Sequence, residues 1–368
     1  MNKIKITSIF IAFAGMMTYC SQDKMLQEIT PLKTELSLND DYQYSGTTNE
    51  IGKLGRVLFY EKGLSVNNAI SCGSCHKQHL AFADDVPFSL GFENSKTLRN
   101  TISLHDFQSG FLTFNFLPSQ SSSLFWDGRS NSVSDAVIQP ILNHVEMGIK
   151  TEKEIVNLLN TKGYYASLFK SAYGSEEITI DKVADALQGF LISLNSFDSK
   201  FDKSQSGAET LTPLEQEGQR LFTEKYDCNS CHNILNPQGY GDFNDPTATA
   251  DGFRNIGLNN NEVDLGRAEV TENEADKGKF RIPKLKNVAL TAPYMHDGRF
   301  ETLEDVLEHY STGIQNNANL DESLAENGYP KKMNISESEK EAMVAFLNTL
   351  TDYSLISDPK FSDPFIVK

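Results

Sequence analysis

The sequence is poor in positive charge and has no long apolar run. The first shortage argues against binding to polyanions, and the second argues against a membrane-spanning helix. Its 368 residues hold 33 lysines and arginines against 50 aspartates and glutamates, for a formal net charge of −17. This balance argues against nucleic acid and against direct binding to anionic lipid, because both attract basic proteins. It suits a basic protein partner, but it also simply keeps a protein soluble. The apolar stretch at residues 6–17 is shorter than the roughly 20 residues that a membrane-spanning helix needs.

The N-terminus has the pattern of an export signal. Lys3 and Lys5 precede the apolar stretch, and Cys20 follows it. The surroundings of Cys20 resemble a bacterial lipoprotein processing site, although Tyr19 stands where a small residue is usual. We predict a signal peptide at 1–20 and a polar tether at 21–48, with export to the periplasm and a lipid anchor on Cys20 as the protein's attachment to a membrane. The alternative is ordinary cleavage that removes Cys20 or leaves it free.

Cysteine is also scarce, and four of the five cysteines lie in two pentapeptides. These are Cys72-Gly73-Ser74-Cys75-His76 and Cys228-Asn229-Ser230-Cys231-His232. The pattern C-x-x-C-H is typical of c-type haem attachment, in which two thiols add to the haem vinyl groups and the histidine binds the iron. Zinc half-sites or disulfides are the alternatives, but neither needs a histidine directly after the second cysteine. We predict two covalently bound haem c groups, held by Cys72, Cys75 and His76 and by Cys228, Cys231 and His232.

The two motifs lie in a weak internal repeat. Leu54-Gly55-Arg56-Val57-Leu58-Phe59 precedes the first, and Glu217-Gly218-Gln219-Arg220-Leu221-Phe222 precedes the second. Capping boxes and apolar periodicity predict further helices. They are expected from Thr212 and at 151–159, 180–197, 302–310 and 336–350. The fold class is therefore mainly α: two cytochrome c-like haem domains at 49–205 and 206–368, with long loops at 77–125 and 233–290 and little strand.

Several further motifs carry a family resemblance. They include Ala81-Phe82-Ala83-Asp84, Phe125-Trp126-Asp127-Gly128-Arg129, Phe280-Arg281-Ile282-Pro283 and Leu290-Thr291-Ala292-Pro293-Tyr294-Met295-His296-Asp297-Gly298. Over about residues 50–352 the chain resembles the bacterial di-heme cytochrome c peroxidase family, and within it the MauG-like branch.

The resemblance implies a di-haem peroxidase. It would reduce hydrogen peroxide to water with electrons from a small redox protein, either a c-type cytochrome or a cupredoxin. The alternative is a MauG-like oxidase that uses peroxide to oxidise or mature a protein substrate. In MauG the oxidising equivalents leave through a surface tryptophan, and Tyr226 holds that position here. A non-catalytic di-haem electron carrier is a third alternative.

For the first haem, the resemblance implies an iron open to peroxide. Many family members have a distal histidine ligand where this chain has Phe92, which cannot bind iron. His79 is close by in sequence, and we expect it to face elsewhere. Glu146 matches the family's distal acid–base, since a carboxyl in an apolar pocket can move a proton between the two peroxide oxygens. Ala136 replaces a glutamine that the family usually has, so one polar contact is missing.

For the second haem, the resemblance implies a sixth ligand. Tyr310 holds the position of the tyrosine ligand in MauG, and Met295 is the alternative. A phenolate would lower the reduction potential, whereas a thioether would raise it. Trp126, the only tryptophan, matches the residue that relays electrons between the two haems.

A calcium ion between the domains is also implied. Asn100, Thr291 and Pro293 match the family's ligands, the last two through backbone carbonyls, which a hard cation accepts. Arg99 and Arg129 could pair with haem propionates or with local carboxylates such as Asp127, and the sequence leaves both possibilities open.

Overall fold

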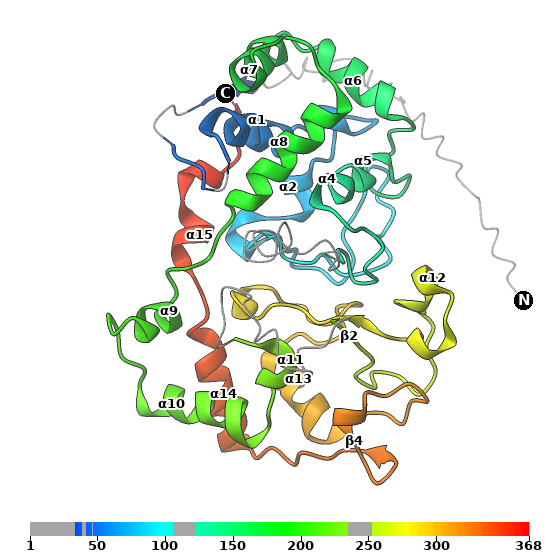
Figure 1. The fold of residues 1–368 in the computed structure, drawn as a ribbon, viewed down its shortest axis with the longest axis vertical. Coiled ribbons are helices and arrows are strands. Elements are labelled where there is room, and N and C mark those ends of the chain that lie inside the picture. Colours follow the sequence, from blue (N-terminus) through cyan, green and yellow to red (C-terminus); the bar gives the residue numbers. More distant parts are fainter. Residues whose placement is uncertain (1–33, 39–41, 46, 106–122, 235–251, 368) are drawn as a thin grey trace, which may run out of the picture.

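The protein forms two lobes, one above the other in Figure 1. The computed structural model describes residues 34–38, 42–45, 47–105, 123–234 and 252–367. The predicted signal peptide, Cys20 and most of the tether lie outside the described residues. No helix in the described ranges is long and apolar enough to cross a membrane.

Each lobe is a set of short helices around its own apolar core. The N-terminal lobe contains α1 (Asn49–Tyr60), α2 (Cys72–Cys75), α4 (Val133–Ala136), α5 (Gln139–Leu142), α6 (Glu152–Asn160), α7 (Tyr164–Tyr173) and α8 (Ile180–Ser193). The C-terminal lobe contains α9 (Lys200–Gln205), α10 (Pro213–Arg220), α11 (Asn229–His232), α12 (Ala268–Thr271), α13 (Leu303–Glu308) and α14 (Glu337–Asn348). The last helix is α15 (Tyr353–Ser357).

Strands occur only as antiparallel pairs within the described ranges. They are β1 (Thr34–Leu36) with β6 (Phe365–Val367), β2 (Phe253–Arg254) with β3 (Phe280–Arg281), and β4 (Ala325–Glu326) with β5 (Tyr329–Pro330). The predicted fold class, mainly α with little strand, is confirmed.

The predicted helix starts are accurate because the caps are local. Thr151 caps α6, and capping boxes at Thr212 and Ser336 start α10 and α14. The ends are less accurate. Helix α8 stops at Ser193 rather than at 197, because the backbone of Leu194 leaves helical geometry with ψ at 76°. The segment predicted at 302–310 is α13 followed by a π-helical turn, His309–Gly313.

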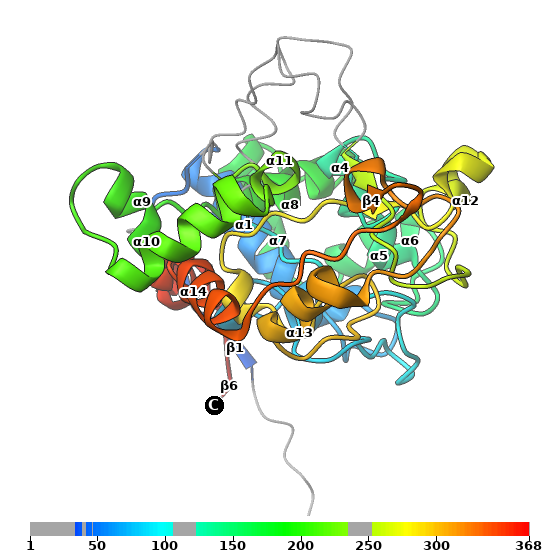
Figure 2. The same ribbon diagram turned by 90° about the horizontal axis from the view of Figure 1, so that it is seen from below.

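The internal repeat marks two equivalent helix crossings. In the N-terminal lobe α1 crosses α8, and a Cβ added to Gly55 would lie 1.9 Å from the carbonyl oxygen of Ala186. In the C-terminal lobe α10 crosses α14, and a Cβ on Gly218 would lie 1.9 Å from the carbonyl oxygen of Ala342. Figure 2 shows α10 and α14 side by side. Only glycine permits so close an approach of two helix backbones.

The C-terminal segment returns to the N-terminal lobe. Leu355 and Phe361 join the N-terminal core, and Tyr60 donates its hydroxyl proton to the Phe361 carbonyl at 2.7 Å. Strand β6 pairs with β1, which lies within the stretch predicted to be a tether. The predicted second domain contains everything from residue 206 to 368. The structure differs because these apolar side chains complete the core of the first lobe.

The first prediction concerns the α1–α8 crossing. We expect Gly55→Ala to lower the free energy of unfolding by about 1–3 kcal/mol, the usual cost of overpacking, despite the better helix propensity of alanine. Urea denaturation of the haem-loaded protein measures this. Gly163→Ala is the matched control, because a Cβ there meets no atom within 4 Å. Equal stability of the two variants would contradict the crossing.

Candidate functional site

The first C-x-x-C-H motif presents its histidine by way of a strained turn. His76 follows α2, and its Nδ1 donates a proton to the Phe82 carbonyl at 2.8 Å, which leaves Nε2 as the ring nitrogen for a metal. Ala81 and Phe82 both have positive φ, 52° and 62°. Such backbone costs on the order of 1–3 kcal/mol per residue. The buried Phe82 ring packs 6.0 Å from that of Phe59 and offsets this cost, so the turn is held with its carbonyl toward His76.

The second motif repeats this arrangement. A π-helical turn, Leu221–Lys225, joins α10 to the segment that leads into α11. His232 donates from Nδ1 to the carbonyl of Pro283 at 3.0 Å, so its Nε2 is again left for a metal. Both motifs therefore present one histidine nitrogen beside two thiols.

The residues of both motifs fit haem better than zinc or disulfides. All four cysteines are free thiols, and burial raises the pKa of Cys72 and Cys228 to about 12 and that of Cys75 to about 11. A structural zinc site needs four ligands, and no group of three or more histidine, cysteine or acidic side chains in the described ranges is arranged to hold a metal ion.

The burial of the two histidines also favours haem. Burial lowers the pKa of His76 and of His232, yet each keeps some accessible surface. They therefore line space inside the lobes, as a ligand to an enclosed haem would.

Glu146 lies in a pocket beside the first motif. The pocket has a volume of about 360 Å³ and is lined by Arg129, Gln139, Pro140, Leu142, Asn143, His144 and Glu146. Burial raises the pKa of the Glu146 carboxyl, and the charge of Arg129 opposes that rise. Asn143 donates to Oε1 at 2.9 Å. A negative charge on Glu146 is near enough to raise the pKa of the Cys72 and Cys75 thiols. A proton-carrying group therefore lies at the first motif.

The other residues singled out near the first motif have simpler positions. Phe92 packs against the Glu146 loop: its N–H donates to the Glu146 carbonyl at 2.9 Å, and its ring covers Gly148. His79 lies exposed on the turn Gln78–Leu80. Ala136 ends α4, and its methyl group packs against the N-terminal core.

Trp126 lies at the contact between the lobes. Its indole Nε1 donates to the Asn100 carbonyl at 2.9 Å, and its own carbonyl accepts from the Arg281 N–H at 2.8 Å. Its ring centroid is 6.5 Å from that of His296, which in turn stacks on Phe280 at 3.6 Å. The structure thus brings the only tryptophan of the N-terminal lobe against aromatic rings of the C-terminal lobe.

The sequence assigned no role to His296, although it lies in a recognised motif next to Met295. Burial lowers the pKa of His296 to about 4, so the ring is neutral at neutral pH. Its carbonyl accepts from the Asn100 N–H at 2.7 Å. The motif was the available signal, but the stack on Phe280 depends on packing that no local pattern encodes.

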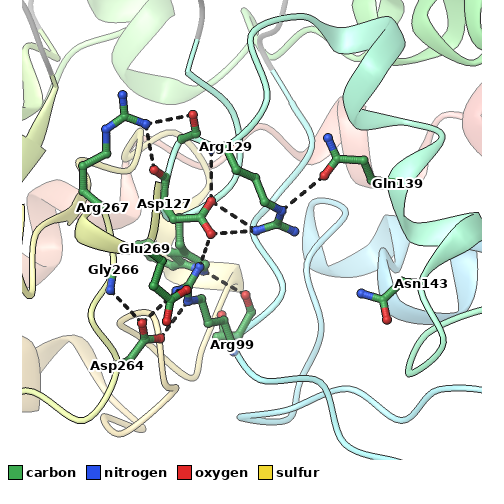
Figure 3. Close-up of polar contacts among 12 residues, drawn as sticks. Arg99, Asp127, Arg129, Gln139, Asn143, Asp264, Gly266, Arg267 and Glu269 are labelled. Atoms are coloured by element: carbon green, nitrogen blue, oxygen red, sulfur yellow. Dashed lines mark hydrogen bonds and ion pairs between the residues drawn. The ribbon is translucent and has the colours of Figure 1, made fainter. Parts of the chain in front are cut away.

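A network of ion pairs surrounds this contact (Figure 3). Arg99 binds Asp127 at 2.5 Å in its own lobe, and it binds Asp264 through two bonds of 2.7 Å in the other lobe. Glu269 adds a bond of 2.9 Å. Burial alone would raise the pKa of Asp264, but the bonds and charge of Arg99 hold it below its usual value.

Two further arginines complete the network. Arg129 pairs with Asp127 at 3.0 Å and lies over the Phe125 ring. Arg267 donates to the Asp127 and Gly128 carbonyls at 3.0 and 2.9 Å. Of the two possibilities left open for Arg99 and Arg129, the structure therefore shows the pairing with local carboxylates.

At the second motif, the structure places Tyr310 beside the cysteines. Tyr310 lies in the π-helical turn His309–Gly313, and such turns are frequent at functional sites. Burial raises the pKa of its phenol, and so do the charges of Cys228 and Cys231. Met295 instead lies in a left-handed turn with φ at 74°, directly before His296.

Two of the candidate calcium ligands, Asn100 and Pro293, lie on segments that pack together at the junction of the lobes. The Asn100 side chain lies 3.2 Å from the Val86 carbonyl. A Cβ on Gly298 would meet Pro87 and Pro293, so the 293–298 turn packs against the segment beside Asn100. Amide and carbonyl oxygens of this kind are ligands that calcium accepts.

Known proteins resemble this chain in sequence and in fold. The model of the di-haem cytochrome c peroxidase family matches residues 49–210. Cytochrome c551 peroxidase of Nitrosomonas europaea is 31% identical over 86% of this chain and 83% of its own length. The methylamine utilization protein MauG of Methylorubrum extorquens is 31% identical over 82% of this chain and 78% of its own.

Solved structures agree with these matches. A MauG-like protein associated with microbial copper homeostasis is 30% identical, with a TM-score of 0.74 over 92% of this chain and 99% of that chain. The diheme peroxidase BthA from Burkholderia thailandensis shares the fold, with a TM-score of 0.67 at 22% identity over 86% of this chain and 90% of that chain. The chain belongs to the family of bacterial di-haem cytochrome c peroxidases and MauG-like proteins.

Proposed function

We propose that this protein reduces hydrogen peroxide to water in the Glu146 pocket, with electrons from a small c-type cytochrome. The observation that carries the proposal is a buried carboxyl of raised pKa beside the first haem-attachment motif. The haem bound there supplies the redox-active iron at which peroxide reacts. Two electrons and two protons convert one peroxide into two waters.

Glu146 is the group that moves the proton. With its pKa raised toward neutrality, it can take a proton from the near oxygen of peroxide and return it to the far one. Asn143 orients Oε1 through the bond of 2.9 Å, and Arg129 keeps the carboxyl from becoming too weak an acid. Phe92 supports an open first iron, because its ring offers no ligand.

Trp126 is placed to carry electrons from the C-terminal lobe. Its ring meets His296, and its carbonyl is bonded to the strand that leads to the proximal contact of His232. The position of Tyr310 beside Cys228 and Cys231 supports it as the ligand of the second haem, with Met295 as the alternative. Because burial raises the pKa of the phenol, its proton would have to be displaced when Tyr310 binds the iron.

The proposal also includes a calcium ion, a cellular location and an electron donor. Asn100, Thr291 and Pro293 would hold a calcium ion at the lobe junction. The N-terminal signal would send the chain to the periplasm, with a lipid on Cys20. There it would meet a cytochrome or, alternatively, a cupredoxin as electron donor. Export agrees with the chemistry of thiol addition to haem, and the calcium ligands are oxygens as that ion prefers.

Oxidation of a protein substrate is the second candidate. MauG relatives match this chain as well as the peroxidases do. Tyr226, two residues before Cys228, donates its hydroxyl proton to Glu339 at 3.0 Å. Bonds from Lys225 and Ser336 lower the pKa of Glu339 to about 2, so Glu339 is ionised and accepts the hydrogen bond of Tyr226 as a carboxylate.

One experiment separates the two candidates. Peroxide turnover is measured with reduced cytochrome c, without reducing the enzyme beforehand. Rapid oxidation of the cytochrome supports the peroxidase. A long-lived oxidised state that cytochrome c does not quench supports oxidation of a protein substrate instead.

The second prediction tests the role of Glu146. We expect Glu146→Gln to slow peroxide turnover by about 10²–10⁴-fold, since the amide cannot carry the proton. Spectra of the oxidised protein should still show one high-spin and one low-spin haem. Glu152→Gln, an exposed carboxyl on α6, is the control and should be fully active. Near-normal turnover of Glu146→Gln would remove Glu146 from the mechanism.

The third prediction concerns pH. Because burial raises the pKa of Glu146, kcat/KM should fall on acidification at a pH above the ordinary carboxyl value of about 4.3. Arg129 stabilises the carboxylate, so Arg129→Ala should raise this pKa and move the acid limb to higher pH. The pH–rate profile measures both effects. If the acid limb of Arg129→Ala does not move, or moves to lower pH, the electrostatic coupling of Arg129 to Glu146 is disproved.

The fourth prediction decides the ligand of the second haem. We expect Tyr310→Met to raise its reduction potential by a sizeable part of the roughly 0.8 V range that axial ligands cover. Met295→Leu should leave the reduction potential and the low-spin spectrum of the second haem unchanged. Spectroelectrochemical titration measures them, and the reverse pattern would make Met295 the ligand.

A further inference from the structure

Arg281 connects the two lobes through its backbone. It lies on β3, and its N–H donates to the Trp126 carbonyl at 2.8 Å. Two residues later, the Pro283 carbonyl accepts from Nδ1 of His232 at 3.0 Å. At about 3.3 Å per residue, the two contacts are only about 7 Å apart along the chain. Arg281 therefore lies within the span of one haem from the proximal histidine of the second site.

The guanidinium of Arg281 has no acidic partner within the described ranges. Burial lowers its pKa, and no carboxylate opposes that effect. The other arginines at this junction are satisfied: Arg99 binds Asp127 and Asp264, and Arg254, on the paired strand β2, binds Asp321 at 2.8 Å. An unpaired ion inside a protein costs several kcal/mol, so such a group calls for an anion.

The direction of the Arg281 side chain indicates which anions it can reach. Side chains alternate along a strand, and Phe280 uses one face of β3 to stack on His296. Arg281 consequently faces away from that stack. Although deep in the protein, its side chain keeps some accessible surface, as His232 and Tyr310 do. Arg281 thus combines depth with residual accessible surface in the same way as His232 and Tyr310, as expected of a residue beside the second haem.

We propose that Arg281 binds a propionate carboxylate of the second haem and so fixes that haem relative to Trp126. The planar guanidinium can donate two parallel hydrogen bonds to a carboxylate, and such charge-assisted pairs are strong and geometrically specific. One residue then holds the relay tryptophan with its backbone and the cofactor with its side chain. The proposal rests on haem attachment at Cys228 and Cys231, not on peroxidase activity.

The test measures the reduction potential of each haem in the purified two-haem protein. Removing a positive charge beside a haem favours its oxidised form. We expect Arg281→Gln to shift the oxidised-to-reduced ratio of the second haem at least tenfold, a fall of about 59 mV for a one-electron couple. Arg281→Lys, which keeps the charge, should recover most of the shift. Arg220→Gln, an exposed arginine of the same lobe, should change nothing.

Three results would overturn the proposal: unchanged potentials in Arg281→Gln, a shift confined to the first haem, or failure of Arg281→Lys to recover the shift. Should Arg281→Gln not fold, a crystal structure of the wild-type two-haem protein decides the matter. We expect the guanidinium within hydrogen-bond distance of a propionate oxygen of the second haem, and a greater separation would disprove the pairing. Neither measurement uses turnover, so a failed peroxidase assay leaves this test intact.

Discussion

The contact between the two lobes is centred on one guanidinium, that of Arg99, which bonds carboxylates on both sides. It bonds Asp127 in its own lobe and Asp264 in the other, and the Asp127 side chain is only 5% exposed. Loss of Arg99 would remove the bonded cation from Asp264, and breaking so desolvated a pair typically costs about 3–5 kcal/mol. The exposed pair Arg220–Glu217 carries no such penalty. Because Trp126 is the residue directly before Asp127, the same network that joins the lobes also positions the tryptophan.

The two haem-attachment sites share a frame and differ in the side chains around them. In both lobes a glycine lets two helices cross, and a backbone carbonyl takes the Nδ1 proton of the histidine. The first site then adds Phe92 and the Glu146 pocket, whereas the second adds Tyr310 beside its cysteines. Duplication of one frame, followed by different surroundings, supports two haems of unequal reactivity in one chain.

Much of the site could be predicted because its signals are short. Thr151, Thr212 and Ser336 mark helix starts through contacts within one turn. The haem-attachment motifs need only five consecutive residues. The sequence did not indicate that Leu355 and Phe361 would complete a core more than 150 residues earlier in the chain. The positions of His296 and Arg281 likewise needed the packed structure, since their partners belong to other segments.

The sequence by itself determined the chemistry that depends on local spacing: two thiols and a histidine for each haem, the caps, and the glycines of the repeat. Tertiary structure alone decided which distant residues meet. Arg99 and Asp264 are 165 residues apart in the chain, and no local pattern pairs them. The physical reason is that a cap or an attachment motif gains its energy from neighbours along the chain. An ion pair or an aromatic stack between lobes forms only after both cores have packed and set the distance between them.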